Sequence, residues 1–170
     1  PGAHNRDNAA AAALAALAAG ATPEGCVAAL PAFEPLPHRL NTLREVDGVC
    51  WVDDSVSTTP ESTAVAVAAF TRPVILLAGG RDKGCDWRPL LEAARRTKAV
   101  VAYGETGPKL SAEVPGAHLE RDLDGAVNRA RSLARPGDVV LLSPGFSSYD
   151  AFPGFDARAA RFRKLVEGPL

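Results

Sequence analysis

The sequence is poor in cysteine, in surplus charge and in long apolar runs, and each shortage excludes a class of protein. Its three cysteines, Cys26, Cys50 and Cys85, are odd in number and far apart, so neither a disulfide framework nor a zinc site is expected. A formal net charge of −1 leaves no basic surplus for general nucleic-acid binding. We therefore expect a cytoplasmic protein that has no nucleic-acid partner.

No stretch is apolar enough to suggest a membrane partner. The longest apolar-leaning run, residues 9–19, is dominated by alanine and is too short and too weakly hydrophobic to span a bilayer. No basic-then-apolar leader begins the chain. The first residues are Pro1-Gly2 rather than methionine, which suggests a start further upstream or a processed or engineered terminus.

Familiar catalytic and nucleotide-binding signatures are also missing. No G-x-G-x-x-G follows a predicted strand, and no G-x-x-x-x-G-K-[ST] phosphate loop is present. The histidines are His4, His38 and His118, and none lies in a motif that would pair with Ser148 as a nucleophile. A serine-based covalent mechanism is therefore not expected.

The length of 170 residues leaves room for one ordinary domain and a fragment of another. Good helix formers fill residues 4–19, and a second short helix is predicted over 25–30. This pair has no strand to pack on, so it is the end of a preceding domain or an appendage to the following one. Three prolines between residues 31 and 39 mark a boundary, which divides the chain into 1–33 and 34–170.

An alternation of strands and helices follows this boundary. Residues 40–46 and 49–52 flank Asp47-Gly48, which predicts an antiparallel hairpin with a type I′ turn. Later strands are apolar at every position, as in a parallel sheet covered on both faces. We predict a Rossmann-like α/β fold with a mostly parallel sheet, helices on both faces, an initial hairpin and a short helical remnant before it. The further predicted strands are 74–78, 99–103, 118–120 and 138–142, and the predicted helices are 59–70, 87–97, 107–113, 122–134 and 155–167.

Three predicted strands run directly into polar segments. The first, residues 53–59, is dense in carboxylates and hydroxyls; Thr59 alone could be an ordinary helix cap. The second, residues 79–84, carries Lys83 among three glycines; a solvated loop tip would explain the lysine alone but not the glycines. The third, residues 143–150, offers hydroxyls and backbone amides. Because open α/β sheets bind ligands at the carboxyl ends of their strands, we expect an anion-binding site there.

Five motifs in this order resemble the Mur ligase family of peptidoglycan synthesis, and most closely its glutamate-adding members. The resemblance implies that residues 1–33 end a central ATPase domain and that residues 34–170 form a C-terminal glutamate-binding domain. It implies a monomeric, ATP- and Mg²⁺-dependent amide ligase whose partners are glutamate, ATP and UDP-N-acetylmuramoyl-L-alanine. The motifs are H-N-x-x-N at 4–8, L-P-H-R at 36–39, D-D-S-x-S-T at 53–58, G-G-x-D-K-G at 79–84 and L-L-S-P-x-x-x-S-x-D-x-F at 141–152.

The same resemblance implies a role for particular residues. No catalytic residue or metal ligand is expected within the chain, because the phosphate loop and the magnesium ligands of such ligases lie upstream, so the chain alone is expected to be inactive. The residues implied to bind ATP are His4, Asn5 and Asn8 at the adenine, and His38, Arg39 and Asp54 at the ribose and phosphates. Those implied to bind glutamate are Thr58, Lys83, Ser148 and the backbone amide of Phe155.

One position departs from the family pattern. Where D-glutamate ligases commonly have Asp-Ser-Lys, this chain has Asp54-Ser55-Val56, so a cation expected beside the amino-acid carboxylate is missing. A ligase that adds L-glutamate to the same nucleotide is therefore an open alternative. A non-catalytic Rossmann-like nucleotide-binding module is a second one.

Overall fold

The computed structural model describes residues 3–33 and 36–168, with side chains described from Arg6 onward. It divides into two compact units, Pro1–Leu36 and Pro37–Leu170. The first unit contains helix α1 (Ala3–Ala18), helix α2 (Pro23–Ala29) and a 3-10 helix, η1 (Leu30–Ala32). Thr22 caps α2 by accepting a hydrogen bond from Gly25 N at 3.1 Å. Large apolar side chains of this unit are exposed, among them Leu14 and Val27.

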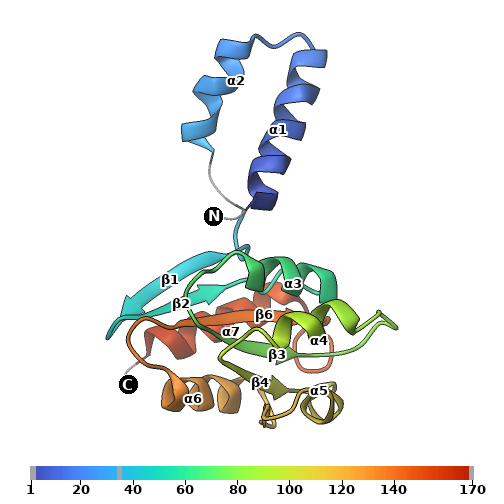
Figure 1. Cartoon of the computed structure of the whole chain (residues 1–170), viewed down its shortest axis with the longest axis vertical. Helices are drawn as coiled ribbons and strands as arrows, with labels where there is room; N and C mark the ends of the chain where they lie inside the picture. The colour runs from blue at the N-terminus through green and yellow to red at the C-terminus, as the bar shows by residue number, and fades with distance from the viewer. Residues whose placement is uncertain (1–2, 34–35, 169–170) are drawn as a thin grey trace. The chain divides into compact units, whose positions relative to one another are not determined.

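The second unit is built on a six-stranded sheet with the order β1-β2-β6-β3-β4-β5 (Figure 1). Only the β1–β2 pair is antiparallel among these strands; the other neighbours are parallel. The last strand in the sequence therefore lies in the middle of the sheet, between β2 and β3. The strands are β1 (Asn41–Val46), β2 (Val49–Asp53), β3 (Val74–Gly79), β4 (Ala99–Tyr103), β5 (His118–Leu119) and β6 (Val139–Gly145).

The hairpin that opens this unit has the predicted turn. Asp47 and Gly48 have φ angles of 51° and 74°, and a type I′ turn requires positive φ at both positions. The turn connects β1 to β2 in the register Val46 opposite Val49. The prediction of an antiparallel hairpin is confirmed.

Helices cover both faces of the sheet (Figure 1). Along β3, Val74, Leu76 and Ala78 contribute to one core cluster, and Ile75 and Leu77 contribute to the other. This alternation explains why the strand is apolar at every position. The first face is covered by α3 (Pro60–Ala68), α4 (Arg88–Ala94) and α5 (Gly107–Glu113), and the second by α6 (Leu123–Leu133) and α7 (Phe155–Glu167).

The predicted fold class is confirmed, although several element ends differ from the prediction; helix α3, for example, ends at Ala68 and not at Phe70. Helix α4 stops at Ala94, three residues before the predicted end at Thr97. Strand β6 continues to Gly145 instead of stopping at Leu142. Its register with β3 shifts beyond Leu142, and such a bulge leaves room for Pro144, which has no N–H for a regular ladder. No helix among the described residues is long and apolar enough to cross a membrane.

Candidate functional site at the carboxyl ends of the strands

The three polar segments lie at one edge of the sheet. Strands β2, β6 and β3 are adjacent and parallel, with Asp53 opposite Leu142 and Leu142 opposite Leu77. Their carboxyl ends therefore meet, and the segments that follow them are brought together as expected for a ligand site in an open α/β sheet. These segments are residues 53–59 after β2, 143–150 at the end of β6, and 79–84 at the end of β3.

Asp53 anchors the segment before β1 to this edge. Its buried carboxylate accepts a hydrogen bond from Ser55 N at 3.0 Å and lies 2.7 Å from His38 Nδ1. His38 has a φ of 60°, a left-handed conformation that such contacts must stabilise. Its carbonyl accepts from Val56 N at 3.3 Å, and its Nε2 lies 3.8 Å from Asp156 Oδ1 on α7. These contacts fix His38 beside the strand ends. The sequence analysis gave Asp53 no individual role, and the structure shows that it holds His38.

Asp54 joins the end of β2 to the end of β6. Its carboxylate accepts from Ser143 Oγ at 2.7 Å and from Leu40 N at 3.2 Å. Burial raises the pKa of Asp54, although hydrogen bonds from Ser57, Ser143 and Leu40 N and the nearby charge of Arg39 oppose the increase. Arg39 is exposed, so its guanidinium remains accessible beside a buried carboxylate.

Arg158 on α7 is a buried residue that the sequence analysis missed. It is 1% exposed, and it donates to Ser55 Oγ at 3.1 Å, to Ser55 O at 3.0 Å and to Phe146 O at 3.1 Å. Ser55 Oγ in turn donates to Phe155 O at 3.1 Å. One guanidinium therefore connects the segments after β2 and at the end of β6 to the start of α7.

A signal for Arg158 was present in the sequence. It lies four residues before Phe162 and eight before Val166, both buried on α7, so it occupies the apolar stripe of an amphipathic helix. A charged residue on such a stripe requires buried hydrogen-bond acceptors. Nearby, burial raises the pKa of Tyr103 to about 12 against the opposing charge of Arg158.

The glycine-rich segment after β3 is joined to the segment at the end of β6. Arg81 N donates to Ser147 O at 2.8 Å, and Ser147 N donates to Arg81 O at 3.1 Å. Gly80 has a φ of 133° and a Cβ there would lie 2.2 Å from Ser147 O, so this close approach requires glycine. Lys83, two residues after Arg81, is exposed and makes no ion pair with any residue of 3–33 or 36–168. Its ammonium group is accessible to an anionic ligand.

The remaining predicted glutamate ligands lie at the same edge. Ser148 is 3% exposed, and its carbonyl accepts from Ala151 N and Phe152 N. Thr58 is half-buried between β2 and α3, and Phe155 is the first residue of α7, where a backbone N–H has no acceptor within the helix. Within the described part of the chain, the hydroxyls of Thr58 and Ser148 form no hydrogen bonds.

The predicted adenine ligands belong to the other unit. Asn8 is exposed on α1. The side chains of His4 and Asn5 lie outside the described part of the structure.

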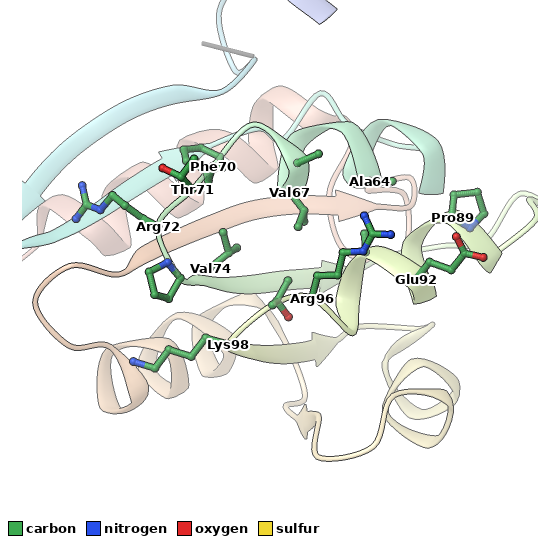
Figure 2. Close-up of a pocket in the computed structure, with 14 residues that line it drawn as sticks. Ala64, Val67, Phe70, Thr71, Arg72, Val74, Pro89, Glu92, Arg96 and Lys98 are labelled. Atoms are coloured by element: carbon green, nitrogen blue, oxygen red, sulfur yellow. The ribbon is translucent and has the colours of Figure 1, made fainter. Parts of the chain in front are cut away.

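A groove of about 600 Å³ lies at the opposite end of β3 (Figure 2). Residues of both α3 and α4 line it, with Val67 and Val74 on its walls and Arg72, Arg96 and Lys98 around it. Val74 begins β3, whereas the predicted site follows Gly79, which ends it. The groove is thus separate from that site. Among the residues that the structure describes, no cluster of three or more histidine, cysteine or acidic side chains could hold a metal ion.

Comparison with known proteins agrees with these features. The family described as "Mur ligase, glutamate ligase domain" matches residues 38–146. The UDP-N-acetylmuramoylalanine–D-glutamate ligase of Myxococcus xanthus is 44% identical over 98% of this chain and 37% of its own length. The corresponding ligase of Salinibacter ruber is 40% identical over 98% of this chain and 37% of its own length.

Solved structures support the fold. The UDP-N-acetylmuramate-alanine ligase of Thermotoga maritima matches 98% of this chain and 38% of its own, with a TM-score of 0.73 and 16% identity. A folylpolyglutamate synthase/dihydrofolate synthase of Yersinia pestis, complexed with AMPPNP and a Mn ion, matches 74% of this chain and 32% of its own, with a TM-score of 0.59 and 18% identity.

The chain spans less than two fifths of the length of the curated relatives that it matches. The family match covers all six strands of the sheet and the polar segments 53–59 and 79–84, and it ends inside the segment 143–150. The chain therefore belongs to the Mur ligase family, and it carries the family's glutamate ligase domain.

Proposed function

We propose that this chain is the C-terminal, amino-acid-binding part of an ATP-dependent ligase that joins D-glutamate to UDP-N-acetylmuramoyl-L-alanine in peptidoglycan biosynthesis. The observation that carries the proposal is the meeting of three polar strand ends at β2, β6 and β3, with the accessible Lys83 on one of them. The names of the 40–44% identical relatives support D-glutamate over L-glutamate. Residues 1–33 would then end the ATPase domain, in line with the unit boundary at Leu36.

Lys83 would neutralise the side-chain carboxylate of glutamate. The hydroxyls of Thr58 and Ser148 and the backbone amide of Phe155 would set the direction of the bound amino acid through charge-assisted hydrogen bonds. Val56 has no charge that could neutralise the α-carboxylate of glutamate. We therefore propose Lys83 as the only cation among the residues assigned to the amino acid. The role of these groups is orientation and charge neutralisation, not covalent catalysis.

The residues near Asp54 are suited to ATP. Arg39 offers an exposed guanidinium for a phosphate, His38 is held in place by Asp53, and Asn8 offers an exposed amide for adenine. When bound, ATP supplies the phosphoryl group that activates the carboxylate to be joined. We place the Mg²⁺ ligands outside this chain, and we propose a monomeric cytoplasmic enzyme, in line with the three free cysteines.

Lys83→Ala in the complete ligase tests the proposal. Removing one member of a partly buried charge-assisted pair costs about 2–5 kcal/mol, so the KM for D-glutamate should rise about thirtyfold or more while the KM for ATP changes little. Lys164→Ala, at an exposed position on α7, is the matched control. Steady-state kinetics with each substrate varied separately measure the difference.

Two results would contradict this assignment. An unchanged KM and kcat for glutamate would remove Lys83 from the amino-acid site and leave it a solvated surface lysine, whose replacement costs less than roughly 0.5 kcal/mol. Equal losses for glutamate and ATP would assign it to ATP binding or to domain closure. Repeating the assay with L-glutamate tests the stereochemical part of the proposal.

A further inference from the structure

Asp82 organises the segment that carries Lys83. Its Oδ1 accepts hydrogen bonds from Gly84 N at 2.9 Å and Cys85 N at 3.1 Å, and its Oδ2 accepts from Trp87 Nε1 at 3.1 Å. Partial desolvation raises the pKa of Asp82, but these hydrogen bonds and the charge of Lys109 together lower it. The carboxylate therefore acts as a charged acceptor at the centre of the turn.

This turn includes Lys83 itself. Lys83 lies between Asp82 and Gly84, inside the ring that the bond from Gly84 N to Asp82 Oδ1 closes. Gly84 has a φ of 80°, a left-handed conformation in which other residues are strained. The backbone on both sides of Lys83 is thus constrained, although its side chain is exposed.

Trp87 connects this turn to the segment that carries Ser148. Its ring is buried and packs on Phe146, with centroids 4.7 Å apart and an interplanar angle of 55°. Phe146 lies two residues before Ser148. The reciprocal backbone hydrogen bonds of Arg81 and Ser147 form a second connection between the same two segments. Lys83 and Ser148 are therefore held on backbones that are joined twice.

We propose that Asp82 is a positioning residue that, through its turn and through Trp87, sets the separation between the Lys83 ammonium and Ser148. This inference rests on the proposed function, because both groups are assigned there to one glutamate. A fixed separation selects a side chain of one length, since a cation and a hydroxyl that are held apart can contact the same amino acid only if it spans them. Asp82 thereby favours glutamate over the shorter aspartate.

Kinetics of the complete ligase test the inference with four variants and a matched control. Asp82→Asn keeps an oxygen for Gly84 N and Cys85 N but cannot accept from both these amides and the indole. Trp87→Phe removes the indole N–H and keeps an aromatic ring. Asp86→Asn is the control, because Asp86 is an exposed acid of the same loop that contacts Arg88. Lys83→Ala and the Asp82→Asn/Lys83→Ala double variant complete the cycle.

We expect Asp82→Asn to raise the KM for D-glutamate about tenfold, to leave the KM for ATP within about twofold, and to reduce the preference for D-glutamate over D-aspartate. Trp87→Phe should have a smaller effect in the same direction, and Asp86→Asn none. In the Lys83→Ala background, Asp82→Asn should change the KM for glutamate less than about twofold, because the group that it positions is gone. In the 170-residue chain, NMR should show faster amide exchange at Gly84 and Cys85 in Asp82→Asn.

Each contrary result has a distinct meaning. Equal rises in KM for both substrates, an unchanged preference over aspartate, or a full effect in the Lys83→Ala background would reduce Asp82 to a structural residue and overturn the inference. If Lys83→Ala leaves the KM for glutamate unchanged, the proposed function is contradicted, and the inference that rests on it fails as well. A strong effect of Lys83→Ala beside an inert Asp82→Asn would remove only the positioning role.

Discussion

At the level of single residues, buried polar side chains hold two of the three strand-end segments together. Arg158 bonds the segments after β2 and at the end of β6, and Asp54 bonds the same two segments through Ser143. Neither residue has to contact a ligand for these bonds to matter. Such buried polar networks make the arrangement of the loops specific, at a cost in desolvation.

The desolvation cost of the buried Asp54 carboxylate can be measured from the pH dependence of the free energy of unfolding. Burial raises its pKa in the folded chain, so the unfolded chain ionises first as the pH rises and stability is progressively lost until the folded value is passed. Asp54→Asn removes that loss. We expect the variant to gain free energy of unfolding relative to the native chain as the pH rises above about pH 4, measured by urea denaturation.

A variant with the opposite sign serves as the control. Arg161 lowers the pKa of Asp124 through a hydrogen bond, so the stabilising contribution of Asp124 is present above its unfolded value and is lost as the pH falls. Asp124→Asn should therefore be less stable than the native chain above about pH 4, and the difference should shrink as the pH falls below that value. An Asp54→Asn variant that also loses relative stability as the pH rises would contradict our account of its burial.

At the level of elements, local patterns predicted most helices and strands, but not how distant strands pair. The bounds of α5 and α7 and the turn at Asp47-Gly48 were confirmed, because caps, turn residues and apolar periodicity are local. The central place of β6 depends on long-range pairing, which chain order does not reveal. The contact of Asp53 with His38 likewise requires the folded path of residues 37–40. The three polar segments at the strand ends were predicted from the sequence, but the buried hydrogen bonds of Asp54 and Arg158 that connect two of them were not.

The cap of α3 provides a test at this scale. Thr59 and Ser62 form a reciprocal capping box at the start of the helix, so the helix-cap explanation of Thr59 holds. Thr59→Ala should lower the free energy of unfolding by about 1 kcal/mol. Thr71→Ala, at an exposed position after the helix, should change it by less than roughly 0.5 kcal/mol. Equal losses in urea denaturation would show that the cap contributes nothing specific.

At the level of the whole molecule, the proposed function gives this chain only the amino-acid-binding part of the ligase reaction. The unit Pro37–Leu170 has its own sheet, with core clusters on both faces, so we expect it to bind an amino acid without its neighbours. We expect no ligase activity from the 170-residue chain, because the proposal assigns the phosphate loop and the Mg²⁺ ligands elsewhere. ATP- and glutamate-dependent phosphate release by the purified chain would contradict that division of roles.

The most direct test of the central claim is an NMR titration of the isotope-labelled 170-residue chain with D-glutamate. Our account predicts localised shifts of the backbone amides at Thr58, Lys83, Ser148 and Phe155, weaker shifts with L-glutamate, and a loss of the response in Lys83→Ala. Shifts confined instead to the groove between α3 and α4, around Val67 and Arg96, or no localised shift at saturating D-glutamate, would contradict it.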